Sequence, residues 1–174
     1  MRTIIHVTKK LEKLIKSSIS NENSDLCGKL GKWNAAVFFL DRKKCWLVTN
    51  GLSQYNVILT DIKSTDLKGI EEMFKNALFS QLIFDGILID FNNLSELIGR
   101  LDFYPTDNDR KTTGFQNQRI EDLNYWRIEF GGLANMPIND LTNRINKSPI
   151  HLGKSRKMAD YTDSITEMRR LCED

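Results

Sequence analysis

The sequence predicts an α+β protein, with strands in the first third of the chain and helices in the rest. Apolar residues occur in short β-branched or alternating runs up to about residue 60, and from about residue 64 they recur every three or four positions. The chain has 174 residues, of which 40% are hydrophobic, so it is long enough for one well-formed core. We therefore expect an N-terminal antiparallel sheet, made of a three-stranded meander plus a first strand, packed with several C-terminal helices.

The first strand is expected at residues 3–7, which are apolar and rich in β-branched side chains. A short amphipathic helix should follow at residues 9–17, because three apolar residues there are spaced as on one helix face. Residues 18–32 are polar and contain two glycines, which is typical of a loop.

The meander is the clearest local prediction. Apolar runs at residues 35–40, 45–49 and 55–60 are joined by the polar connection 41–44 and by a turn at Asn50-Gly51. Connections this short favour antiparallel pairing of consecutive strands.

Helical spacing begins after residue 61. It predicts one helix over residues 64–81 and another over 93–101. The apolar stretch 82–91 between them fits a helix or a strand equally well.

Two further helices are expected in the second half of the chain. The first covers residues 116–130 and ends at Gly131-Gly132. The second runs to about residue 145, with Pro137 in its first turn and Asn135 as its candidate cap. We expect residues 1–155 to form a single compact domain and residues 156–174 to form a polar tail, with a terminal helix at 161–171 as one option.

Composition excludes several classes of protein. The net charge is only +2, from 25 basic and 23 acidic residues, which argues against a strongly basic nucleic-acid coat or an acidic tail. The three cysteines lie far apart and the two histidines share no ligand spacing, so we expect no disulfide framework, no metal and no cofactor. The longest apolar-rich stretch, 79–91, is too short and too polar to cross a bilayer, and the N-terminus lacks a secretory pattern. We expect a cytoplasmic protein that does not act at a membrane.

No recognised catalytic motif is present: the sequence lacks a GxSxG elbow, a P-loop and a dinucleotide-binding glycine turn. Sequence alone leaves spatially assembled catalytic sets open, so we assign no catalytic residue and favour a protein that is not an enzyme.

The polar run 106–114 is the best candidate for an anion site. It is dense in hydrogen-bonding side chains and leads into a predicted helix, whose first amides can bind an anion. The alternative is a solvated loop whose side chains only cap that helix. If the fold brings this run together with polar residues farther along the chain, they would form a pocket. The candidate ligand residues are Thr106, Asn108, Arg110, Lys111, Asn117, Arg144 and Asn146.

Charge is unevenly placed along the chain. Residues 1–59 hold ten Lys/Arg and four Asp/Glu, residues 60–109 hold four and ten, and residues 110–174 hold eleven and nine. Residues 141–159 contain no acid at all, so this stretch can follow phosphates or face a partner. The candidate nucleic-acid or partner-binding residues are Arg119, Lys147, Lys154, Arg156 and Lys157.

Several short motifs together resemble a small bacterial domain family of unknown function, over about residues 1–155. The resemblance implies a compact cytoplasmic domain and no established activity, cofactor or catalytic residue. The motifs are Thr8-Lys9-Lys10, Trp33-Asn34-Ala35, Asp41-Arg42-Lys43-Lys44, Asn50 with Tyr55-Asn56-Val57, residues 106–110 with Gly114 and Asn117, and residues 141–146 before Ser148-Pro149.

These observations favour a non-enzymatic binding or interaction module in a bacterial regulatory, toxin–antitoxin or defence setting. Segregated charge can orient association, so another protein is the expected partner and a homo-oligomer is left open. The alternative is a nucleic-acid-binding or nucleic-acid-processing protein that uses the basic residues of 110–157.

Overall fold

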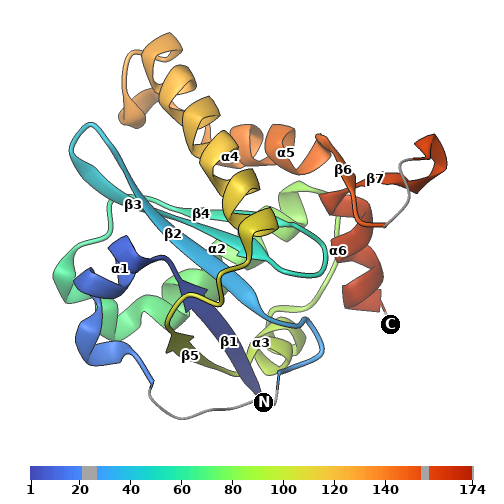
Figure 1. Ribbon diagram of the computed structural model, residues 1–174, viewed down its shortest axis with the longest axis horizontal. Coiled ribbons are helices and arrows are strands. Elements are labelled where there is room, and N and C mark those ends of the chain that lie inside the picture. The colour runs from blue at the N-terminus through green and yellow to red at the C-terminus, as the bar shows by residue number, and fades with distance from the viewer. Residues whose placement is uncertain (21–26, 154–156, 174) are drawn as a thin grey trace.

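The computed structural model describes residues 1–20, 27–153 and 157–173. Within these residues the chain forms a five-stranded sheet in the order β4-β3-β2-β1-β5, a separate two-stranded ribbon β6-β7, and helices on both faces of the larger sheet (Figure 1). The predicted α+β class is confirmed.

The bounds of the elements are as follows. The strands are β1 Arg2–Val7, β2 Trp33–Leu40, β3 Lys43–Asn50, β4 Asn56–Leu59, β5 Arg100–Tyr104, β6 Pro149–His151 and β7 Tyr161–Asp163. The α-helices are α1 Lys9–Leu14, α2 Ile70–Phe84, α3 Phe91–Ile98, α4 Arg110–Glu129, α5 Ile138–Lys147 and α6 Ser164–Glu173. Short 3₁₀ helices are η1 Lys16–Ser18, η2 Ser64–Gly69, η3 Leu133–Asn135 and η4 Met158–Asp160.

The meander forms in the predicted strand order, but the connection expected over residues 41–44 is shorter, because β3 begins at Lys43 and leaves only Asp41 and Arg42 in the turn. β2 pairs antiparallel with β3 from Trp33 opposite Asn50 to Leu40 opposite Lys43, and β3 pairs antiparallel with β4. Asp41 and Arg42 both have positive φ, +49° and +63°, which is the backbone that a tight two-residue hairpin turn requires.

The first strand does not extend the antiparallel pattern. β1 lies between β2 and β5 and runs parallel to both, so the sheet is mixed, and the expectation of an antiparallel sheet throughout is wrong at this point. The physical reason is connection length. Residues 8–32 and 60–99 are long enough to cross over a face of the sheet, which parallel pairing requires.

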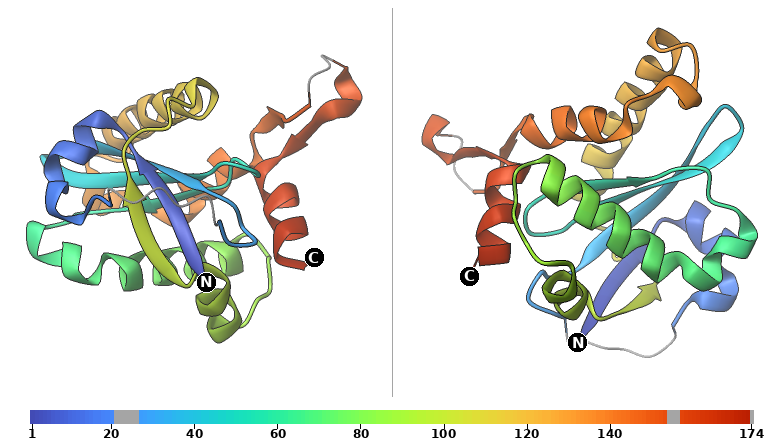
Figure 2. Two further views of the ribbon diagram at one scale, coloured as in Figure 1. Left: turned by 60° about the horizontal axis from the view of Figure 1, so that its bottom comes forward. Right: turned by 180° about the vertical axis from the view of Figure 1, so that it is seen from behind.

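Different helices cover the two faces of the sheet (Figure 2). On one face α2 and α3 pack against alternate strand residues, with Phe74 set edge-on to Trp33 at 5.3 Å between ring centroids. On the other face α4 lies over β2 and β3 and α5 over β4, where Leu123, Leu141 and Phe38 belong to one core. Leu11 of α1 joins the first of these two cores.

Several helix bounds differ from the sequence prediction. α1 ends at Leu14 rather than at residue 17, and the helix expected over 64–81 is the 3₁₀ helix η2 followed by α2, which ends at Phe84. The helix predicted over 93–101 is α3, which begins earlier because the Asp90 side chain accepts hydrogen bonds from the amides of Asn92 and Asn93, and ends before Gly99. α4 begins at Arg110 rather than at 116, because Asp109 caps it. The stretch 82–91 is helical only to Phe84.

The cap predicted for α5 is also wrong. Asn135 lies in η3, and Pro137 occupies the N-cap position rather than the first turn. Proline fixes its own φ and supplies no side-chain acceptor, so the helix starts without a side-chain cap.

The C-terminal segment folds onto the rest of the chain. β6 and β7 pair antiparallel, and α6 follows as a helix close to the one expected over 161–171. Ile165 and Met168 of α6 are buried in the core that contains α2.

Candidate functional site

The carboxyl ends of β1 and β5 lie side by side in the sheet. The two strands are parallel, with His6 opposite Tyr104. The chain then leaves them toward opposite faces, since α1 joins the core of α2 whereas α4 packs on the other side. In open sheets with parallel strands, ligands bind at this kind of divergence beyond the carboxyl ends.

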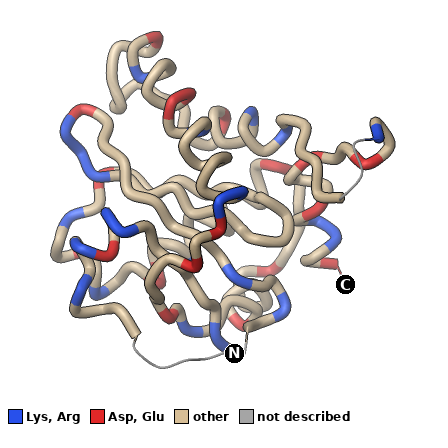
Figure 3. The backbone as a smooth tube through the Cα atoms, viewed as in Figure 1, with Lys and Arg blue, Asp and Glu red and all other residues tan. Residues whose placement is uncertain are grey.

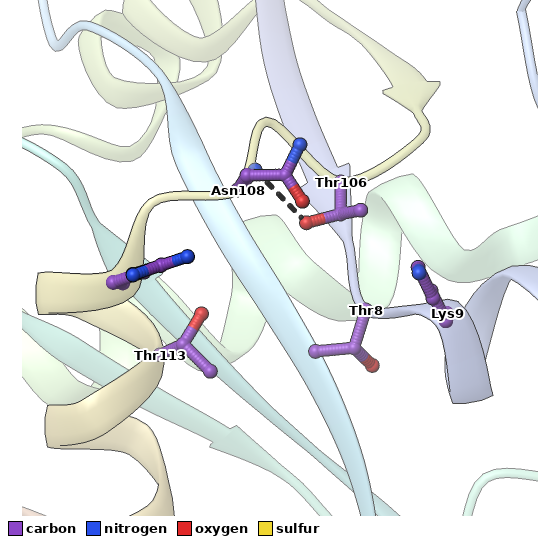
Figure 4. A pocket seen from close by; sticks show the side chains of 6 residues that line it. Thr8, Lys9, Thr106, Asn108 and Thr113 are labelled. Atoms are coloured by element: carbon purple, nitrogen blue, oxygen red, sulfur yellow. Dashed lines mark hydrogen bonds between the residues drawn. The ribbon is translucent and has the colours of Figure 1, made fainter.

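A cleft of about 410 Å³ opens at this point. Figure 4 shows its threonine and asparagine side chains around one opening, supplied by the end of β1, the loop after β5 and the start of α4. The cleft is lined by Thr8, Lys9, Thr106, Asn108, Arg110 and Thr113.

The loop after β5 is held in shape by its own side chains. Asn108 has a φ of +58°, and its main-chain amide donates a hydrogen bond to Thr106 Oγ1 at 3.1 Å. Asp109 accepts from the amide and the hydroxyl of Thr112, at 3.1 and 2.8 Å, and so caps α4. The loop therefore presents its threonine and asparagine to the cleft while Asp109 is occupied by the helix.

Asp107 fixes the loop to the sheet. Its carboxylate accepts a hydrogen bond from Asn34 Nδ2 at 3.0 Å and forms an ion pair with Lys32. Burial by itself raises the pKa of Asp107, but hydrogen bonds from Lys32 and from the main-chain amide of Asp109, together with nearby positive charge, outweigh it and hold the pKa below its ordinary value. The carboxylate is charged at neutral pH and its charge is already matched.

The cleft itself carries uncompensated positive charge. Lys9 and Arg110 are exposed, and the side chain of neither forms an ion pair or a hydrogen bond with another residue that the structure describes. The residues that line the cleft include no carboxylate, imidazole or thiol. Nearby His6 is engaged through Nδ1, 2.8 Å from the carbonyl oxygen of Pro105. This arrangement can bind an anion.

The predicted ligand residues separate into two groups. Thr106, Asn108 and Arg110 line the cleft, and Asn117 lines a second hollow beside it. Lys111 points elsewhere and donates to the His151 carbonyl oxygen at 3.0 Å.

The other two predicted ligand residues lie on α5, away from the cleft. Arg144 pairs with Asp140 at 2.9 Å. Asn146 is fully buried, and its Oδ1 accepts from the amide of Asn56 at 2.9 Å. Arg110, Asn117, Arg144 and Asn146 therefore do not converge in one pocket.

The residues predicted to bind nucleic acid are not gathered into one stripe. Arg119 is mostly buried, where burial lowers its pKa, and it lies 4.0 Å from Asp122. Lys147 and Lys157 are exposed on different elements. Lys154 and Arg156 lie outside the described residues.

A buried polar network around Asp85 is a feature that sequence reasoning missed. Asp85 accepts hydrogen bonds from Tyr55 Oη at 2.5 Å and from three side-chain amides of α2 and α5. A sequence signal was present, because Asn143 lies between Leu141 and Ile145, Asn146 directly follows Ile145, and all four are buried positions of α5.

Two kinds of specialised feature are absent from the described part of the chain. No group of three or more His, Cys, Asp or Glu side chains is arranged to hold a metal ion. No helix there has the length and apolar character needed to cross a membrane.

Comparison with protein-family models matches residues 4–167 to a family described as Domain of unknown function (DUF6933). This confirms the resemblance to a small domain family of unknown function and carries the matched region past residue 155. No curated protein and no solved structure matches the chain.

Proposed function

Because the chain belongs to the DUF6933 family, whose function is not defined, we propose from its own geometry that it is a non-enzymatic binding module for a small phosphate-bearing ligand. The observation that carries the proposal is the pair of exposed cations, Lys9 and Arg110, which face the cleft without an acidic partner among the described residues. Charge-assisted hydrogen bonds from such groups to phosphate oxygens are the strong ones.

The neutral lining supports the same ligand class. Three threonine hydroxyls and one asparagine amide can donate to the remaining oxygens of a phosphate. The absence of a carboxylate from the lining matters as much, because a carboxylate would repel the ligand and could act as a base. Binding without turnover is the chemistry that fits these groups.

Calorimetric titration with pyrophosphate and with inorganic phosphate at low salt tests this function. We expect saturable binding that Arg110→Gln weakens by roughly tenfold or more, since a hydrogen bond to a charged group contributes about 1.5–3 kcal/mol. Lys111→Gln is the matched control, because it removes the same charge from the next residue, which faces away from the cleft.

Two results would contradict the proposal. One is the absence of saturable binding by the unaltered protein. The other is an equal loss of affinity in Arg110→Gln and Lys111→Gln, which indicates diffuse electrostatic attraction and favours the nucleic-acid alternative. Turnover of a phosphate ester that disappears in Arg110→Gln would show instead that the protein is an enzyme. The regulatory, toxin–antitoxin or defence setting stays a prediction.

A further inference from the structure

A second hollow of about 500 Å³ adjoins the cleft and shares Thr8 with it. It lies between α1 and α4, over the end of β2. Its lining combines apolar and amide groups. The residues around it are Thr8, Lys10, residues 36–39, Asn117, Ile120 and Asn124.

One side of α4 faces both spaces. Arg110 and Thr113 line the cleft, and Asn117 lines the hollow. Residues separated by three and four positions lie on the same side of a helix, and a span of seven residues covers about 10 Å along the helix axis. A single extended small molecule can therefore contact both compartments at once.

The floor of the hollow is a strand edge that no described residue pairs with. The ladder between β1 and β2 ends at Val7 opposite Ala35, closed by a hydrogen bond from the Thr8 amide to the Ala35 carbonyl oxygen at 3.0 Å. β2 continues to Leu40. Alternate residues of a strand direct their peptide groups to the same edge, so Val37 and Phe39 present theirs where β1 has already turned away. No described residue forms a backbone hydrogen bond with them on this edge.

These main-chain groups provide donors and acceptors in a fixed row. The side chain of Val37 is buried in the core on the α2 side, so its contribution to the hollow is the main chain. The Asn117 side chain adds one more donor and acceptor, and it has no hydrogen-bond partner among the described residues. Ile120 and Phe39 add apolar surface. A flat heteroaromatic ring with donors and acceptors along one edge matches all three kinds of group.

We propose that the ligand is a mononucleotide, with its phosphate in the cleft on Lys9 and Arg110 and its base in the hollow on Asn117 and the free edge of β2. This inference rests on the proposed function, since the phosphate site is the same. The inference adds that the phosphate belongs to a nucleotide. A sugar phosphate without a base leaves the β2 edge and the apolar wall unused.

A ligand series measures the contribution of the base. We expect the tightest-binding of AMP, GMP, CMP and UMP to bind about tenfold more tightly than ribose 5-phosphate, because the base adds hydrogen bonds that the sugar phosphate cannot form. Asn117→Ala should remove most of that difference and leave the affinity for ribose 5-phosphate within about twofold. Gln118→Ala is the matched control, because Gln118 is the exposed neighbour that lines neither space.

Hydrogen exchange of the main chain gives a second readout that needs no substitution. The amides of Val37 and Phe39 should exchange quickly in the free protein, since no strand protects them, and become protected on adding the nucleotide but not on adding ribose 5-phosphate. Equal affinities for nucleotides and ribose 5-phosphate, or unchanged exchange at both amides, would overturn the nucleotide assignment while the phosphate site stands. Failure of every probe, pyrophosphate included, would overturn both proposals together.

Discussion

Asp85 is buried, with 8% of the residue exposed, and its carboxylate is held by neutral donors from two helices and the segment before β4. Tyr55 donates from the segment before β4, Gln81 from α2, and Asn143 and Asn146 from α5. Burial and the adjacent carboxylate raise the pKa of Tyr55 well above its ordinary value, so its hydroxyl stays a donor. Asp85 thus ties α2 and α5 to the sheet as the acceptor of all four groups.

Removing this acceptor should destabilise the fold. Asp85→Ala leaves several buried donors unsatisfied, and each costs about 1–3 kcal/mol, so we expect a loss of roughly 3 kcal/mol or more in the free energy of unfolding. Urea unfolding followed by circular dichroism measures it. Asp90→Ala serves as the comparison, because it removes an exposed N-cap carboxylate at a cost of about 1 kcal/mol. Equal losses in the two variants would show that the buried network stabilises the fold no more than an exposed N-cap does.

At the residue scale, the sequence allowed only half of the candidate site to be predicted. Thr106, Asn108 and Arg110 were found because a dense polar run before a helix is visible locally. Lys9 was assigned to an ordinary amphipathic helix, since its approach to the loop after β5 depends on strand pairing across the sheet. Asn146 was assigned to a ligand, whereas its side chain is fully buried and bonded to Asn56.

At the scale of elements, the junction between α3 and β5 depends on Gly99. Its φ is +61°, a conformation that favours glycine, and a Cβ placed there would lie 2.1 Å from the carbonyl oxygen of Met1. That carbonyl accepts the hydrogen bond from the Arg100 amide at 3.2 Å that begins the β1–β5 pairing. The glycine therefore lets the helix end and the strand start within one residue.

Two alanine substitutions distinguish the steric requirement for glycine at position 99 from the general effect of a glycine on helix stability. Gly99→Ala should lower the free energy of unfolding by about 2 kcal/mol or more, because the new methyl group meets backbone and the φ is strained. Gly114→Ala should raise it by roughly 0.5–1 kcal/mol, because Gly114 lies inside α4 with open space around it. Thermal unfolding of both variants checks the opposite signs, and a stabilised Gly99→Ala would contradict the account.

The elements that the sequence predicted well are the ones defined by local pattern. The meander has short turns, so β2, β3 and β4 could be paired from spacing alone. The parallel neighbours of β1 could not, because the partners are separated by long crossovers and a five-residue strand has little periodicity. The cleft arises from that parallel pairing. Its polar loop could therefore be predicted from the sequence, whereas the shape of the cleft could not.

At the scale of the whole molecule, the fold brings some of the segregated charges of the sequence together. Basic residues of the first 59 positions pair with acidic residues of 60–109: Arg2 with Asp102, Lys32 with Asp107 and Lys43 with Asp61. Figure 3 shows the two signs interspersed over the molecule. Segregation along the chain is therefore weak support for a charged partner, whereas the cations left at the cleft remain unmatched among the described residues.

The ion pairing between these two parts of the chain should make the free energy of unfolding depend on pH in the acidic range. The folded pKa of Asp107 lies below its ordinary value of 3.8, so its contribution to stability is present above that value and is lost as the pH falls through the folded pKa. Asp107→Asn should cost about 1 kcal/mol at pH 7 and make the decline in unfolding free energy between pH 5 and pH 3 shallower, because the unfolded variant takes up one proton fewer. Urea unfolding across this range measures it, with Glu96→Gln as the control, since Glu96 is exposed and forms no ion pair within the described residues. Parallel curves for Asp107→Asn and the unaltered protein would mean that the loop after β5, and with it the wall of the cleft, is held by something other than this carboxylate.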